Sequence, residues 1–291
     1  MFKKFILMLS LVIFMFSFSF GIEKEAEKAR EAAIKASVLA KQGKIKEAIV
    51  IYNNSAKIFK KYREKEPNNP YYLQNYQHCI EMPGYIQLMK AIEYQKKGDS
   101  KQAAKYFKAA KDVYGKILKE FPKRQNFINN YKYAKHYWYV ERFKVIEEEH
   151  LKVSDFIALG FSKKIIRLSD YKGSPILLEF WASWCPESRK SLPMLEKLYN
   201  RYKGKGLVII TLTMDKIAGW YRAGYGDKAM ELSKKYGYIF GLATSEISDN
   251  YGYIDSVPMV FLVDKKGKLF KKVREKERTE ENLSKLIKKI L

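Results

Sequence analysis

A cysteine followed by a proline is the most chemically informative feature of this sequence. Cys185 comes shortly after a largely apolar run, Ile176 to Trp181, and directly before Pro186, and the residues that follow carry leucines at helical spacing. Proline is favoured in the first turn of a helix, where its missing N–H costs nothing, so Cys185 is expected at a helix N-terminus. The unpaired amides and the positive dipole end found there favour a thiolate, which is the reactive form of cysteine.

The segments around Cys185 alternate between strands and helices. The apolar run is bounded by Gly173 and Pro175, a pattern typical of a strand covered on both faces. We expect further strands in an early hairpin over 156–168, from about 207 to 215, over 257–264 and over 268–273, and helices after residue 185, over 228–236, near 249 and from 280. This order predicts an α/β domain with a mixed sheet over residues 151–291.

The second half of the chain resembles a known family. The segments WASWCPES, DFIALGFSKKIIRLSDYKGSP and SVPMVFLVDKKGKL are similar to the exported thioredoxin-like proteins of the TlpA/ResA group, and the likeness runs from about Ser154 to Leu291. The resemblance implies a thioredoxin-like fold and thiol–disulfide exchange with exported or membrane proteins that carry thiols or disulfides.

The family's WCxxC motif is changed at one position. Trp184, Cys185, Pro186 and Glu187 match its first four residues, but the second cysteine falls on Ser188. In a dithiol motif the second thiol releases the product by attacking the mixed disulfide. Serine can hydrogen-bond a Cys185 thiolate from one turn away but cannot expel it, so release requires an external thiol.

Two other positions take roles from the resemblance. Val257-Pro258 matches the family's cis-proline turn, where the backbone before the proline pairs with a substrate strand, and Glu179 matches the buried acid that relays a proton to the second thiol in many thioredoxins. The candidate catalytic residues are Cys185, Ser188, Glu179 and Pro258, and the candidate substrate-binding residues are Trp184, Pro186 and Val257.

Three functions are compatible with a single motif cysteine. The first is monothiol exchange, which the matching positions favour. The second is a peroxidase in which Cys185 becomes a sulfenic acid, but related peroxidases carry Pro and Thr or Ser where this chain has Leu178 and Ala182. The third is a catalytically degenerate thioredoxin-fold protein that binds or scaffolds peptides, and it is the main alternative.

A Gly- and aromatic-rich loop around Trp220 is expected to shape the approach to Cys185 or to be an ordinary surface insertion.

Residues 22–150 predict a separate all-α domain with an internal repeat. A shift of 55 residues places Gly43 on Gly98 and matches size and polarity over units of about 29–83 and 84–138. GKIKEAIVIYNNSA and GDSKQAAKYFKAA resemble the heart of a tetratricopeptide repeat. Six helices are expected, as two units of three, followed by a charged boundary near residue 150.

This tetratricopeptide-like domain contains the other cysteine and many aromatic residues. Its tyrosines and Trp138 are expected to pack between repeats or to line a concave surface that binds a peptide or protein. Cys79 falls on Ala134 in the second unit, which favours a small, packed and inert thiol. The sharper alternative is that Cys79 resolves a disulfide formed by Cys185.

The N-terminus predicts export. Residues 1–21 combine Lys3 and Lys4, an apolar run from about 5 to 20 and a small residue at Gly21. This is the layout of a cleaved signal peptide, or of an uncleaved anchor that would hold the chain at the membrane through residues 5–20. The rest of the chain is therefore expected in the periplasm or another extracytoplasmic space, where thiol–disulfide chemistry is meaningful.

Charge and composition exclude some classes of function. The 47% hydrophobic content supports two real cores across 291 residues, and the formal net charge of +24 is spread along the chain. Nucleic-acid binders usually concentrate charge on a recognisable motif, and none is present, so nucleic acid is not an expected partner. The two cysteines and three histidines form no metal-ligand pattern, and no metal or cofactor is expected. The charge indicates a lysine-rich surface, or attraction to anionic lipid or an acidic partner.

Overall fold

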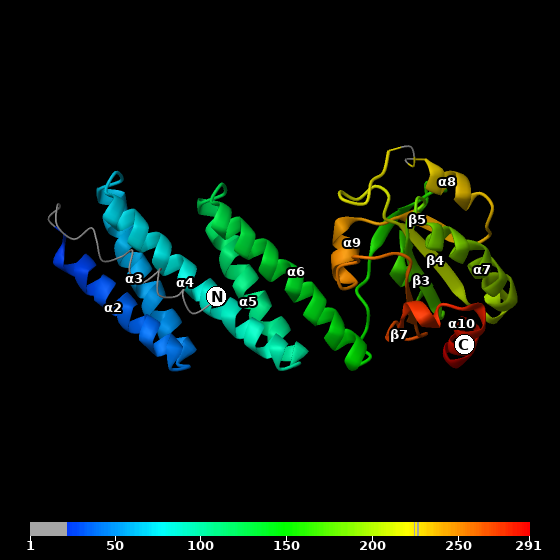
Figure 1. Cartoon of the computed structure of the whole chain (residues 1–291), viewed down its shortest axis with the longest axis horizontal. Helices are drawn as coiled ribbons and strands as arrows, with labels where there is room; N and C mark the ends of the chain where they lie inside the picture. Colours follow the sequence, from blue (N-terminus) through cyan, green and yellow to red (C-terminus); the bar gives the residue numbers. More distant parts are fainter. Residues whose placement is uncertain (1–21, 224, 226) are drawn as a thin grey trace. The chain divides into compact units, whose positions relative to one another are not determined.

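The chain forms two compact units. The structure, a computed structural model, describes residues 22–223, 225 and 227–291, so the predicted signal or anchor over 1–21 lies outside the described residues. One unit takes the chain up to Lys97 together with Lys105–Lys135, and the other takes Gly98–Ala104 and His136–Leu291 (Figure 1). Among the described residues, no helix is both long enough and apolar enough to span a bilayer.

The N-terminal region is all-helical, as predicted. Its helices are α2 (Lys24–Lys41), α3 (Ile45–Lys65), α4 (Pro70–Lys96), α5 (Ser100–Glu120) and α6 (Gln125–Glu148). The predicted repeat reappears in these bounds, because α5 begins 55 residues after α3 and α6 begins 55 residues after α4. Gly43 and Gly98, which the repeat aligns, both have positive φ at the turns that end α2 and α4. The finer likeness to tetratricopeptide repeats stays a prediction.

The expectation of six helices in this region is wrong. The third helix of the first unit and the first helix of the second form one continuous helix, α4, which runs through Pro83 and Gly84. Gly84 lies in the helix instead of making a turn, and it is required for packing: a Cβ there would lie 3.0 Å from Cε2 of Tyr114. Pro83 and Gly84 resemble a helix-breaking pair in the sequence, but α4 stays continuous across them and packs closely on α5.

The second unit is built on a mixed seven-stranded sheet, as predicted. Its strand order is β2-β1-β5-β4-β3-β6-β7, with β3 parallel to β4 and antiparallel to β6. The strands are β1 (Ile157–Gly160), β2 (Ile165–Arg167), β3 (Ile176–Trp181), β4 (Val208–Thr213), β5 (Ile239–Leu242), β6 (Met259–Val263) and β7 (Leu269–Val273). The helices are α7 (Pro186–Tyr202), α8 (Lys228–Ser233), α9 (Ser245–Asn250) and α10 (Glu280–Ile290), with short 3-10 turns η2 (Leu168–Tyr171), η3 (Lys203–Lys205) and η4 (Glu275–Glu277).

Strand β3 is buried on both faces. Side chains alternate along a strand, so Leu178 and Phe180 enter one core with residues of α6 and α9, whereas Leu177 and Trp181 enter another with residues of α7 and α10. Figure 1 shows α9 on one side of the sheet and α7 and α10 on the other. This double cover explains the unbroken apolar run that precedes Cys185.

The core of the sheet includes residues upstream of 150. Phe143 and Ile146 of α6 are 3% and 5% exposed and belong to the same cluster as Phe180 and Phe261. Phe143 lies edge-on to Phe261, with ring centroids 5.3 Å apart. The end of α6 therefore stabilises the sheet, although its sequence is continuous with the helical repeat.

Strand β5 was not predicted from the sequence. It is four residues long and contains Gly241, and both features weaken a strand pattern. The glycine is required by close approach, because a Cβ at position 241 would lie 2.7 Å from Cδ1 of Ile166 and 3.0 Å from the carbonyl oxygen of Leu159. The segment becomes a strand because β4 and β1 hydrogen-bond to it from both sides.

Candidate active site

Cys185 is the N-cap residue of α7. Its backbone is extended, with φ −80° and ψ 119°, and Pro186 occupies the first turn of the helix. The amide of Arg189 donates to the carbonyl oxygen of Cys185, which begins the helical hydrogen-bond pattern. The sequence prediction for this element is confirmed, and it places the thiol at the positive end of a helix of 17 residues.

The loop that leads into Cys185 is held by a buried carboxylate. Asp215 follows β4 and is 2% exposed. Its two carboxylate oxygens accept the amide of Ser183 at 3.1 and 3.2 Å, and Arg189 donates to the carbonyl oxygen of Ser183 at 3.0 Å. Both the N–H and the carbonyl oxygen of Ser183 are therefore hydrogen-bonded, which holds the backbone two residues before the thiol in place.

Two oxygen atoms contact the thiol. Cys185 Sγ lies 3.5 Å from the carbonyl oxygen of Val257 and 3.6 Å from Oε2 of Glu187. Both oxygens accept a hydrogen bond from the thiol. Cys185 is 7% exposed, which leaves a small opening to solvent.

The peptide bond between Val257 and Pro258 is cis, and it lies beside the thiol as the resemblance implied. Arg278, which follows η4, donates a hydrogen bond from Nη1 to the carbonyl oxygen of Pro258. This contact ties the turn to the segment between β7 and α10. No sequence signal pointed to Arg278, because it belongs to no motif and lies 20 positions from its partner.

Glu179 lies in β3 and is fully buried. Burial raises the pKa of its carboxyl group to about 8, against the opposing effects of a hydrogen bond from Ser191 and the charge of Arg278. One oxygen, Oε1, is 2.7 Å from Ser191 Oγ, and the other has no hydrogen-bond partner in the described part of the chain.

A proton count at Ser191 supports a protonated Glu179. Ser191 Oγ also lies 2.7 Å from the carbonyl oxygen of Ser188, which can only accept. A hydroxyl has one proton, so Ser191 cannot donate fully to both oxygens. Its donation to Ser188 weakens the hydrogen bond that would stabilise an ionised Glu179.

Ser188 is completely buried, and its position differs from the expected contact with the thiol. Its Oγ accepts the amide of Ala182 at 3.4 Å. Among the described residues, the hydrogen bonds of Cys185 Sγ go to Glu187 and Val257 and not to Ser188. The serine at the family's second-cysteine position thus binds the backbone that leads into the motif.

The comparison with known proteins agrees with this geometry. The chain is 34% identical over 158 residues to the thiol-disulfide oxidoreductase ResA of Bacillus thuringiensis subsp. konkukian, covering 50% of this chain and 82% of the relative. The chain belongs to the ResA-like thiol-disulfide oxidoreductase family. The ResA-like region is the sheet-containing half of the chain.

Two further relatives and a family model cover the same half. Thiol-disulfide oxidoreductase ResA of Bacillus subtilis is 28% identical over 123 residues, covering 41% of this chain and 63% of the relative. Residues 150–272 match the model described as AhpC/TSA family. The solution structure of a thiol:disulfide interchange protein from Bacteroides sp. is 27% identical with a TM-score of 0.40, covering 48% of this chain and 88% of that one.

The ResA-like domain also carries an aromatic group next to its motif. Trp184 stacks on Trp220 at 6.0 Å between ring centroids, and its Nε1 donates to the carbonyl oxygen of Trp220 at 2.8 Å. The Arg222 guanidinium lies 4.8 Å from the centre of the Trp184 ring. The loop with Trp220 thus contacts the motif tryptophan, a contact that the sequence left open.

Cys79 is not paired with Cys185. It lies in α4, is 0% exposed, and burial raises the pKa of its thiol to about 12. A thiol in this environment stays protonated and closed to solvent. In the described residues of this ResA-like chain, no group of three or more His, Cys, Asp or Glu side chains lies close enough to hold a metal ion.

Proposed function

We propose that this chain is an exported thiol–disulfide exchange protein that uses Cys185 alone, while its helical repeat domain binds the partner. The observation that carries the proposal is the position of Cys185 Sγ at the N-terminus of α7, 3.5 Å from the carbonyl oxygen that precedes cis-Pro258. A substrate strand that pairs with the backbone at Val257 brings its own sulfur next to the thiol.

The exchange proceeds in two balanced steps. The Cys185 thiolate attacks one sulfur of a partner disulfide, a new S–S bond forms, and the other partner sulfur leaves as a thiolate that takes up a proton. An external thiolate then attacks the partner's sulfur in this mixed disulfide, forms a disulfide with the partner and releases Cys185 as a thiolate. Trp184 and Pro186 flank the attacked bond.

A defined disulfide tests the chemistry. The full-length chain is incubated with oxidised glutathione, and adducts are located by mass spectrometry of peptides. We expect the adduct on Cys185 in the wild type and in Cys79→Ala, and its loss in Cys185→Ser. An adduct on Cys79 alone, or none in the folded protein, would overturn the exchange function.

The main alternative is a binding protein with a degenerate motif. Two observations favour it: Cys185 is only 7% exposed, and the second motif position is a buried serine. If a client protein binds Cys185→Ser as tightly as the wild type, and the wild type forms no mixed disulfide with it, binding is the better description.

Export and partner binding by the repeats are separate parts of the proposal. Export is tested by fractionation of cells that produce the full chain, with protease accessibility in spheroplasts as the readout. Partner binding is tested with Tyr133→Ala, which removes a ring that is 39% exposed on α6. A role in binding predicts weaker client affinity with unchanged glutathione reactivity of Cys185.

A further inference from the structure

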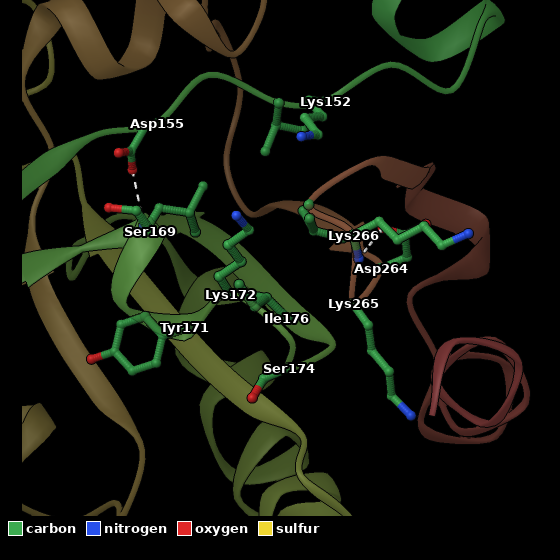
Figure 2. Close-up of a pocket in the computed structure, with 14 residues that line it drawn as sticks. Lys152, Asp155, Ser169, Tyr171, Lys172, Ser174, Ile176, Asp264, Lys265 and Lys266 are labelled. Atoms are coloured by element: carbon green, nitrogen blue, oxygen red, sulfur yellow. Dashed lines mark hydrogen bonds between the residues drawn. The ribbon is translucent and has the colours of Figure 1, made fainter.

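A pocket lies at the end of the sheet opposite Cys185. It has a volume of about 180 Å³ and is walled by Leu168, Ile176 and Val263 (Figure 2). Ile176 begins β3, whereas Cys185 follows its last residue. A strand of six residues extends about 20 Å, so the pocket and the thiol are separated by the length of the sheet.

Lysines surround this pocket. Lys152, Lys172, Lys265 and Lys266 line it. Figure 2 shows the amino group of Lys172 on the same side as Lys152, while Lys265 and Lys266 extend outward from the other wall. Ser169 and Ser174 also line the pocket.

The sheet register explains why these lysines gather. Ile176 pairs with Val208 at the start of β4 and with Val263 at the end of β6. The loops before β3, before β4 and after β6 therefore lie at one end. The turn η3 adds Lys203 and Lys205 just before β4, and a β-bridge between Lys152 and Lys268 brings in the segment before β1.

The acidic groups at the pocket are occupied by backbone amides. Oδ1 of Asp155 accepts the amides of Phe156 and Ser169, and Oδ1 of Asp264 accepts those of Lys266 and Lys268. Among the described residues, Lys152, Lys172 and Lys266 have no ion pair within 4.0 Å, and Lys265 donates to the terminal residue Leu291. The lining has four lysines and two carboxylates, so positive charge is in excess at the pocket.

The opposite end of the same unit is mixed in charge. Around the thiol, both basic and acidic side chains occur in the first turn of α7 and in the segments that follow β4, α9 and β7. They include Glu187, Arg189, Asp215, Arg222, Asp255 and Arg278. The basic surface is thus a property of one end of the sheet and not of the unit as a whole.

We propose that the lysine-rimmed end of the sheet docks on an anionic phospholipid surface. The phosphate of one lipid lies between Lys152 and Lys172, and its glycerol portion contacts the apolar wall at Leu168. The surrounding lysines add electrostatic attraction to the charged lipid surface. This attraction extends about 8 Å at physiological ionic strength. Docking in this way turns Cys185 away from the lipid, toward exported partners. The proposal does not depend on the thiol chemistry.

Lysine labelling on vesicles tests the docking. The full chain is added to vesicles of phosphatidylcholine, or to vesicles in which a third of the lipid is phosphatidylglycerol, and is acetylated with a water-soluble reagent. We expect phosphatidylglycerol to reduce labelling of Lys172 and Lys266 by about threefold or more, and high salt to restore it. Labelling of Lys190 and Lys216, near the thiol, should not change. Any insertion of residues 1–21 is common to both vesicle types.

A charge-reversed variant and a soluble anion complete the test. Lys172→Glu with Lys266→Glu should abolish protection of Lys152, whereas Lys190→Glu with Lys216→Glu should not. Equal protection of lysines at both ends would overturn the proposal, since it indicates unoriented adsorption. Equal protection by soluble glycerophosphate would also overturn it, because the pocket would then be a site for a free anion.

Discussion

The carbonyl oxygen of Val257 lies 3.5 Å from Sγ of Cys185, although the two residues are 72 positions apart. This contact joins the start of α7 to the turn before β6. In the proposed function, a substrate strand that pairs with this turn would meet the thiol. The same oxygen accepts a hydrogen bond from the thiol. The reactivity of Cys185 therefore depends on the groups that hold this small region together.

Removal of the Glu187 charge should make Cys185 more reactive. A carboxylate 3.6 Å from Sγ disfavours a negative charge on sulfur, so Glu187→Gln should increase the rate of alkylation by iodoacetamide at neutral pH by about fivefold. Glu246→Gln, on the exposed first turn of α9, serves as the control. An unchanged rate in Glu187→Gln would show that the carboxylate does not act on the sulfur.

Glu179 should make stability fall as pH rises. Its pKa in the folded protein is raised to about 8, above that of an unfolded chain, so the folded state holds an extra proton between about pH 4.5 and 8. The contribution of Glu179 to stability is fully present below its pKa in the unfolded chain. It is lost as the pH rises through its pKa in the folded protein. Between pH 4 and pH 9 the wild type should lose about 5 kcal/mol of its free energy of unfolding through this group. Glu179→Gln should not show this loss, so at pH 9 it should unfold at a higher urea concentration than the wild type.

The control for this experiment is Glu246→Gln, because Glu246 lies on the exposed first turn of α9. Urea unfolding of all three proteins at pH 4, 7 and 9 gives the comparison. Parallel pH profiles for the wild type and Glu179→Gln would contradict a buried, protonated carboxyl group.

Arg278 should position the cis-proline turn. It donates to the carbonyl oxygen of Pro258 and its charge lowers the pKa of Glu179. Arg278→Gln should destabilise the protein by about 2 kcal/mol and move the Glu179-dependent fall in stability to higher pH. Lys276→Gln, an exposed change in the same turn, should do neither. A loss of stability without a change in the pH profile would leave Arg278 with a structural role only.

Ser188→Cys should restore a dithiol motif. Ser188 is buried one helical turn from Cys185, where a second thiol can attack a mixed disulfide on the first. We expect the reduced variant to reduce one insulin disulfide per chain without added thiol, ending with an internal disulfide between Cys185 and the introduced thiol, and to turn over when dithiothreitol re-reduces that disulfide. The wild type should stop at the mixed disulfide until an external thiol resolves it. Ser233→Cys, at the exposed end of α8, controls for an added thiol. No gain of turnover would mean that the packing around position 188 prevents the second thiol from reaching the first.

Phe143→Ala should destabilise the unit that contains the sheet, although Phe143 lies in α6. Phe143 is 3% exposed and contacts Tyr251 and Phe261, so its truncation should cost about 3–5 kcal/mol. Thermal unfolding followed by near-UV circular dichroism measures the effect. Leu151→Ala, at a site that is 39% exposed, should cost much less. Similar losses for both variants would show that α6 is not part of this core.

Local sequence determined much of the fold. Pro186 after Cys185 predicted the start of α7, because proline suits the first turn of a helix, and the apolar run predicted β3, because a strand covered on both faces needs apolar residues throughout. The repeat was visible because both copies bury the same helix faces. Each of these features depends on residues close together in the chain. The sequence misled at the boundary between the two repeat units, which falls within one continuous helix, α4, and at β5, where neighbouring strands impose the conformation on a short segment.

Only the tertiary structure decided what surrounds the thiol. Three contacts join residues that the sheet and α7 bring together from separate segments: Val257 with Cys185, Arg278 with Pro258, and the hydrogen bond from Ser191 to Glu179. The same holds for the lysines at the opposite end of the sheet, which the sequence showed only as charge spread along the chain. Side-chain distances set hydrogen bonds, burial and charge, and these distances follow from strand register and helix packing, which no local pattern specifies.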